Sequence, residues 1–351
     1  MAEAQAAGDR SSAAWARVYR VELGASRGAD IQASLAQARE LIEEFEALGD
    51  EAGVAQAGAA AGQFLFFVGR AHEAETLLSR TRDRALAAGV REPSVVATWW
   101  ILTALFFGPA PVREAEERIA RIEPELYRSR NNEAALLRTR ARFAAIQGRF
   151  DEARRKLQAW ADIEQELGRM SRLSSWEGHY IGPLEMAAGR FPEAVVAFRT
   201  GFEALRALGD TGFSSTAAGG LAHALLEVGD VEEAERWARV ALDTSAAGDI
   251  EPKMAGTGAL AVVLARQGKA EEAERTAREA VEMARRTDYV MAQAEVLVDL
   301  ARVQAAAGRR EEAQAAAAEA VELLERKEAW ALVERAREAA ASLVAPPAAS
   351  H

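Results

Sequence analysis

The sequence contains no cysteine, and this absence excludes several kinds of chemistry at once. Disulfide bonds, thiolate-bound metal ions and cysteine nucleophiles all require the missing side chain. The absence also agrees with a reducing compartment, so we expect a cytoplasmic protein. The N-terminal segment MAEAQAAGDRSS has neither a basic start nor an apolar core, and therefore carries no recognisable secretory signal.

Long apolar runs and excess basic charge are missing as well. The most apolar stretch, residues 95–107, is shorter than the roughly 20 residues that a membrane-spanning helix needs. The 54 Asp and Glu outnumber the 43 Lys and Arg, which gives a formal net charge of −11. Because such a chain repels a phosphate backbone, we expect no nucleic-acid partner. Because the apolar stretch is short, we expect no membrane partner either.

The common catalytic motifs are absent too. The sequence has no Gly-x-Ser-x-Gly, no His-Glu-x-x-His and no Gly-x-x-x-x-Gly-Lys-[Ser/Thr] phosphate loop. Acidic pairs such as Glu43-Glu44 and Glu271-Glu272 are expected on exposed helix faces, where they favour solubility. We therefore predict a protein without catalytic residues, cofactor or metal ion. An enzyme built on a helical scaffold is the less favoured alternative.

What the sequence does contain is a repeated turn signal. The motif Gly-x-x-x-Glu-Ala begins at Gly69, Gly148, Gly189, Gly229, Gly268 and Gly308, and its last five members are almost evenly spaced. Gly108, where the motif is stretched, supplies the turn between Gly69 and Gly148, and Gly28 supplies an earlier one. A second series of turn signals, which runs from Gly49 through Thr287-Asp288 to Lys327, alternates with these glycines. Glycine after a helix is a common stop, because it accepts the left-handed conformation.

Two turns in each period predict antiparallel helix pairs. The first helices of the pairs are expected at 12–26, 51–67, 92–107, 132–147, 171–187, 212–227, 252–267 and 289–306. The second helices are expected at 30–48, 71–88, 112–129, 150–167, 191–208, 231–247, 270–286 and 310–326, with a capping helix at 328–344. We therefore predict an all-α solenoid of about eight repeats over 12–344, with flexible tails at 1–11 and 345–351. In such an array each repeat contacts only its neighbours.

These repeats resemble the tetratricopeptide family. Its leucine-small pair is matched by Leu221-Ala222, Leu260-Ala261 and Leu300-Ala301, and its paired alanines by Ala234 with Ala241, Ala273 with Ala280, and Ala313 with Ala320. The repeat is longer than the family's usual period of about 34 residues, and the terminal proline of each unit is missing. Long repeats of this kind are similar to the sensor arms of maltose-regulator-type signalling ATPases and the C-terminal arms of bacterial cyclase-ATPase proteins. The resemblance implies a right-handed superhelix with a concave binding surface.

In that arrangement the first helix of each pair lines the concave groove. Trp15 is one inward position, and the candidate ligand-binding residues are Gln63, Phe66, Phe67, Thr98, Leu102, Phe106, Arg138, Arg142, Trp176, His179, Met186 and His223. The stretch from Thr98 to Phe107 is apolar nearly all round, so it is either a buried helix or an apolar groove floor. Trp176 and Met186 are more typical of packing residues than of ligand contacts.

Charge adds two further candidates. Residues 113–156 hold 12 Lys and Arg against 8 Asp and Glu, which is the reverse of the chain as a whole. Arg138 and Arg142 share one helix face there, and are either a solvated surface or a clamp for carboxylates. His179, His223 and Glu227 could together bind a metal ion, but they lack a short ligand spacing and are more typical of polar groove residues.

Three functions remain open from the sequence. The favoured one is an adaptor that captures a protein or peptide, with an acidic residue beside an apolar anchor, in bacterial signalling or regulation. The alternative is a sensor that binds a small molecule in the central groove. Self-association as a homo-oligomer through the end repeats is also allowed. A long open groove would favour a peptide, whereas a closed pocket with convergent polar groups would favour a metabolite.

Overall fold

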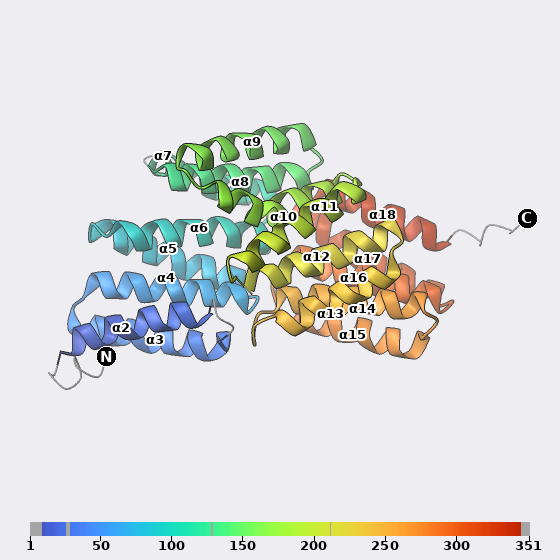
Figure 1. Cartoon of the computed structure of the whole chain (residues 1–351), viewed down its shortest axis with the longest axis horizontal. Coiled ribbons are helices and arrows are strands. Elements are labelled where there is room, and N and C mark those ends of the chain that lie inside the picture. Colours follow the sequence, from blue (N-terminus) through green and yellow to red (C-terminus); the bar gives the residue numbers. More distant parts are fainter. Residues whose placement is uncertain (1–8, 26–28, 128, 211, 345–351) are drawn as a thin grey trace, which may run out of the picture.

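The computed structural model describes residues 9–25, 29–127, 129–210 and 212–344, and all regular structure in this part of the chain is helical. It forms eight antiparallel helix pairs and a last single helix, as predicted (Figure 1). The predicted tails at 1–11 and 345–351 lie almost wholly outside the described residues, although the first helix already begins at Arg10. No described helix combines the length and apolar character needed to cross a membrane.

The helix bounds agree with the predicted ranges to within three residues. The first helices of the pairs are α2 (Arg10–Ala25), α4 (Glu51–Phe67), α6 (Arg91–Phe107), α8 (Arg130–Ile146), α10 (Met170–Ala187), α12 (Gly212–Val228), α14 (Glu251–Arg266) and α16 (Val290–Ala306). The second helices are α3 (Ile31–Leu48), α5 (Ala71–Ala87), α7 (Val112–Leu126), α9 (Phe150–Glu166), α11 (Phe191–Ala207), α13 (Val231–Thr244), α15 (Ala270–Arg285) and α17 (Arg310–Lys327), followed by α18 (Trp330–Val344).

The turn glycines end the helices as expected. Gly69 and Gly148 have φ angles of 82° and 79°, in the left-handed region that glycine tolerates best. The turn after α17 has no glycine, and Glu328 takes the left-handed conformation there with a φ of 63°. Glycine therefore ends most of these helices, and the turns α7/α8, α15/α16 and α17/α18 are formed without it.

The second helices are amphipathic, and their small residues face the helix crossings. On α15 the buried side chains are Ala273, Ala277, Ala280, Val281 and Ala284, at the spacing of one helix face. Ala273 is fully buried while Glu271, two residues earlier, is exposed, which confirms the predicted register. Small side chains at these positions let paired helices approach closely.

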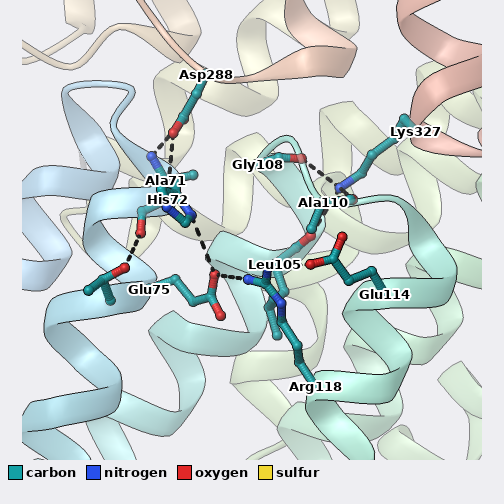
Figure 2. Close-up of polar contacts among 11 residues, drawn as sticks. Ala71, His72, Glu75, Leu105, Gly108, Ala110, Glu114, Arg118, Asp288 and Lys327 are labelled. Atoms are coloured by element: carbon teal, nitrogen blue, oxygen red, sulfur yellow. Dashed lines mark hydrogen bonds and ion pairs between the residues drawn. The ribbon is translucent and has the colours of Figure 1, made fainter.

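The prediction that repeats contact only their neighbours is wrong. The α4/α5 turn lies against the α15/α16 turn: the backbone N–H of Asp288 donates to the carbonyl oxygen of Gly69 over 2.9 Å. The Asp288 carboxylate also accepts the N–H groups of Ala71 and His72, at 2.7 and 2.8 Å (Figure 2). These are the first N–H groups of α5, where a negative charge is stabilised.

A second contact of this kind joins the α6/α7 turn to the end of α17. The Lys327 ammonium group is fully buried, and it donates to the carbonyl oxygens of Leu105, Gly108 and Ala110 at 3.0, 2.7 and 2.8 Å (Figure 2). We call the contacts of Asp288 and Lys327 the clasp. The clasp joins segments that are far apart in the sequence, and it brings the C-terminal half of the superhelix onto the N-terminal half.

Candidate functional site

The curled superhelix encloses a central cavity of about 310 Å³. Its walls come mainly from the first helices of the pairs, from α6 to α16, and from α18. Much of the lining is apolar and includes Phe106, Phe107, Met186, Met254, Met291 and Leu332. The volume is near the lower end of the range for small-ligand sites, roughly 300–1,000 Å³. The structure therefore has a compact, partly open pocket where the sequence predicted a concave groove.

One wall of the cavity carries Arg142. Its guanidinium group donates to the carbonyl oxygen of His179 over 3.0 Å and lies 4.5 Å from the ring centre of Tyr180 and 5.0 Å from that of Phe106. Within the described residues Arg142 pairs with no carboxylate, and burial lowers its pKa. A guanidinium group has five N–H donors, so most of its donors are available to a ligand.

His179 lies beside Arg142 and also lines the cavity. Only 7% of the residue is exposed, yet neither ring nitrogen has a hydrogen-bond partner among the described residues. Burial and the charge of Arg142 lower its pKa to about 3, so the ring is neutral at physiological pH. Because buried polar atoms are nearly always hydrogen-bonded, an unpartnered imidazole in a cavity wall is available for a ligand.

Another part of the lining is acidic. Glu251 is the first residue of α14 and Glu295 lies on α16, and neither side chain has a hydrogen-bond or ion-pair partner within the described part of the chain. Burial raises the pKa of Glu251 to about 7, although the charge of Arg142 acts in the opposite direction. The two groups thus influence each other across the cavity without forming an ion pair.

Several of the remaining charged side chains of the lining pair with one another. A hydrogen bond of 2.9 Å joins the His223 ring to the Asp299 carboxylate, while Arg302 bonds Glu227 at 2.5 Å. Burial alone would lower the pKa of His223, but the charges of Glu295 and Asp299 raise it to about 10. The three residues His179, His223 and Glu227 are therefore not a metal site, and no described group of three His, Asp or Glu side chains could hold a metal ion.

Five of the predicted ligand-binding residues meet in this cavity, namely Phe106, Arg142, His179, Met186 and His223. The other seven do not line it: Gln63, Phe66, Phe67, Thr98, Leu102, Arg138 and Trp176. Thr98 and Leu102 have exposed fractions of 1% and 0%, because their helix packs on both sides in the closed superhelix. The interpretation of residues 98–107 as a buried helix is correct except at its end, where Phe106 and Phe107 reach the cavity.

Arg138 is not the solvent-facing residue that the clamp hypothesis required. It is 8% exposed, and its guanidinium carbon lies 5.3–5.8 Å from the ring centres of Trp99, Trp160, Trp176 and Tyr180. Cation–π attraction stabilises a charge in such a cluster. Arg138 and Arg142 share a helix but not a site, so the pair is not a clamp.

Sequence reasoning missed Glu251, Glu295, Asp299, Arg302 and Arg335, which all line the cavity. One signal was present. Asp299 interrupts the apolar run VLVDLA, and an acid in such a place is 1% exposed only because it has buried partners. Glu251 and Arg335 carry no local signal, since only the closure of the superhelix brings α14 and α18 to the cavity.

Comparison with known proteins agrees with the helical pairs. Residues 254–326 match the family model described as tetratricopeptide repeat. The solved structure of NprR in complex with its cognate peptide NprX has a TM-score of 0.52 and 15% identity, over 82% of this chain and 85% of that one. A sequence comparison with curated proteins found no match.

Two further solved structures are more distant. A Signal Transduction ATPase with Numerous Domains from Pyrococcus horikoshii, which has a tetratricopeptide repeat sensor, gives a TM-score of 0.47 and 15% identity over 88% of this chain. Yeast Tom70 gives 0.44 and 13% over 87%. The chain spans 46% and 60% of those two proteins. Residues 254–326 are thus similar to tetratricopeptide repeats, and the described part of the chain as a whole is an all-α array of helix pairs.

Proposed function

We propose that this protein is a receptor-like scaffold that binds a short peptide segment in its central cavity. The observation that carries the proposal is the cavity itself, which combines an apolar lining with the unpartnered ring of His179 and with Arg142, which has no carboxylate partner among the described residues. Specific small sites have this composition, with few polar groups that orient a ligand among apolar walls. The fold it shares with NprR, a protein solved with a bound peptide, supports the same proposal.

The position of the cavity indicates how ligand binding would change the conformation of the superhelix. Its walls come from α6, α8 and α10 as well as from α14, α16 and α18, so a ligand would touch both halves of the superhelix. A ligand that contacts both halves strengthens the closed form by its differential affinity for that form. We therefore propose a role in signalling or regulation, carried out in the cytoplasm, in which closure of the superhelix is the output.

A small-molecule ligand is the second candidate. The volume of about 310 Å³ and the convergence of Arg142, His179 and Glu251 on one space favour a compact ligand over a long extended chain. Under either proposal the protein binds rather than catalyses. The buried acids and bases of the lining have internal roles, such as the His223–Asp299 pair, or face a ligand without a nucleophile beside them.

A cavity-filling variant tests the proposal. Ala292 lines the cavity, and Ala292→Trp would occupy much of it, whereas Ala270→Trp places the same side chain on the exposed start of α15. Each protein is incubated with a synthetic mixture of random dipeptides to octapeptides and then examined by native mass spectrometry. Wild type and Ala270→Trp should retain the same peptides, and Ala292→Trp should retain none. Equal retention by all three proteins would place binding outside the cavity and overturn the proposal.

A further inference from the structure

The unpaired charges of the cavity define the chemical class of its ligand. Arg142 has no carboxylate partner within the described residues, and on the acidic side Glu251 and Glu295 have no cationic one. A buried guanidinium group without a counter-charge is costly, and so is a buried carboxylate. Arg142 and Glu251 do not relieve each other by pairing, although the charge of Arg142 acts on the pKa of Glu251 and the reverse also holds.

We propose that the cavity binds a small zwitterion, whose carboxylate lies at Arg142 and His179 and whose ammonium group lies at Glu251 and Glu295. The inference rests on the proposed function and names the ligand of the same site. Arg142 can hold a carboxylate with two parallel N–H donors, and the neutral His179 ring can add a third. The ammonium group donates to the carboxylates of Glu251, which is half-buried, and Glu295, which is exposed to solvent at the cavity.

The size and lining limit the zwitterion further. A volume of about 310 Å³ suits a free amino acid or a peptide of two residues, and it is too small for a folded partner. Phe106, Met186, Met254 and Met291 surround the charged groups, so side chains of the ligand should be apolar. Methionine side chains adapt to different apolar shapes, which allows more than one such side chain. Leucine and the dipeptide Leu-Leu are therefore suitable probes.

The charge pattern predicts how binding responds to pH. Glu251 must be ionised to hold an ammonium group, and its pKa is about 7. The charged groups that act on the pKa of Glu251 are Arg142 from α8 and Glu295 from α16, and Glu251 in turn raises the pKa of Asp249 and of Tyr289 in neighbouring turns. Binding of a peptide zwitterion should therefore strengthen from about pH 6 to about pH 7.5, because the fraction of ionised Glu251 rises while the ligand's α-amino group, with a pKa of about 7.7–8.0, stays mostly protonated. This pH dependence should be weaker in Glu251→Gln.

The test uses titration calorimetry of the full chain at about pH 7.5, where Glu251 is mostly ionised and a peptide amino group is mostly protonated. The probes are free leucine, Leu-Leu, N-acetyl-Leu-Leu, Leu-Leu-amide and the doubly blocked N-acetyl-Leu-Leu-amide. Leucine or Leu-Leu should bind, and blocking either end should weaken Leu-Leu by at least about tenfold. In Arg142→Met, Leu-Leu-amide should bind as tightly as Leu-Leu, because the partner of the carboxylate is gone. In Glu251→Gln, N-acetyl-Leu-Leu should bind as tightly as Leu-Leu, because the partner of the ammonium group is gone. Arg155→Met, on an exposed face of α9, is the matched control and should rank the affinities of the probes as the wild-type protein does.

The titrations of wild-type protein with blocked and free probes test the inference even if the variants do not fold. If N-acetyl-Leu-Leu-amide binds as tightly as Leu-Leu, the zwitterion inference is overturned while peptide binding in the cavity stands. If no zwitterionic probe binds but Ala292→Trp abolishes peptide retention, the inference again fails and the proposed function survives. Stronger binding of leucine than of Leu-Leu identifies a free amino acid as the source of the zwitterion, and the reverse order identifies a dipeptide.

Discussion

At the scale of single residues, Arg138 and Arg142 show how neighbouring positions on one helix face can differ in environment. Both stand in the only strongly basic part of an acidic chain. Arg138 lies inside a cluster of four aromatic rings, whereas Arg142 faces the cavity. Other arginines of this region pair with glutamates, as Arg140 does with Glu123 at 2.7 Å. The solvated-surface interpretation is therefore wrong for Arg138.

Replacing Arg138 with an acid should be strongly destabilising. In Arg138→Glu a carboxylate would face the negative faces of Trp99, Trp160 and Trp176 without a counter-charge. Such an uncompensated buried charge costs about 3–5 kcal/mol in the free energy of unfolding, measurable by urea titration. Arg155→Glu on an exposed face should change that free energy by no more than about 0.5 kcal/mol. Equal stability of the two variants would show that Arg138 is solvated.

The buried pair of His223 and Asp299 should make stability depend on pH. The pKa of His223 is about 10 in the folded protein, above its ordinary value of 6.5. Below pH 6.5 the imidazole is protonated in both states, so the pair contributes fully, and this contribution is lost as pH rises through about 10. The stability difference between wild type and His223→Gln should therefore shrink from pH 6 to pH 10 in urea titrations. A difference that grows with pH would mean that His223 is neutral when folded.

At the scale of helices, the pair α10 and α11 brings two backbones into close contact. A Cβ atom added to Gly201 would lie 2.4 Å from the backbone nitrogen of Gly178 and 2.8 Å from its Cα atom. Neither glycine occurs in the turn series, so their role is packing rather than punctuation. Gly178 directly precedes His179, and the close contact therefore positions a cavity residue.

Gly201→Ala should separate these two helices. The added methyl group has no free space, and overpacking of this kind costs about 1–3 kcal/mol in the free energy of unfolding. Because α10 must move, binding of the cavity ligand should weaken as well. Val196→Ala on the same helix changes a residue that is 64% exposed, and it should leave both measurements unchanged. Wild-type thermal stability and affinity in Gly201→Ala would contradict the close contact.

At the scale of the whole molecule, the clasp changes how the repeats depend on each other. An open solenoid loses stability gradually as repeats are removed. Here Asp288 and Lys327, near the C-terminal end, hold turns that follow α4 and α6. Loss of the last helices would therefore also remove the part of the cavity wall that α16 and α18 supply, and would expose the inner faces of the first repeats.

Lys327→Met tests the closure. Methionine keeps much of the volume but leaves the carbonyl oxygens of Leu105, Gly108 and Ala110 without their donor. An unsatisfied buried acceptor costs about 1–3 kcal/mol, so we expect a loss of at least about 2 kcal/mol in the free energy of unfolding. Hydrogen exchange at the Gly108 turn should become faster. The exposed Lys269→Met should match wild type, and an equally protected Gly108 turn in Lys327→Met would contradict the role of the clasp.

The sequence by itself determined the elements of this protein. Helix ends, register and the burial of Ala273 depend on local signals, namely glycine stops and the apolar spacing of one helix face, and the structure confirms them. It also identified Asp288 and Lys327 as members of turns. Their partners could not be predicted, because each contacts a segment in a distant repeat, and no periodic pattern relates the two.

Only the tertiary structure decided where the inward positions lie. Counting along each first helix finds a shared face, and it placed Arg142 and His179 among the candidates for one groove. Curvature of the superhelix then turned part of that face into core, as at Leu102, and part into a cavity wall shared with Glu251. The reason is physical: the pitch of a helix repeat is local, but the closure of the whole superhelix sums small rotations at every pair and is set by contacts between its distant parts.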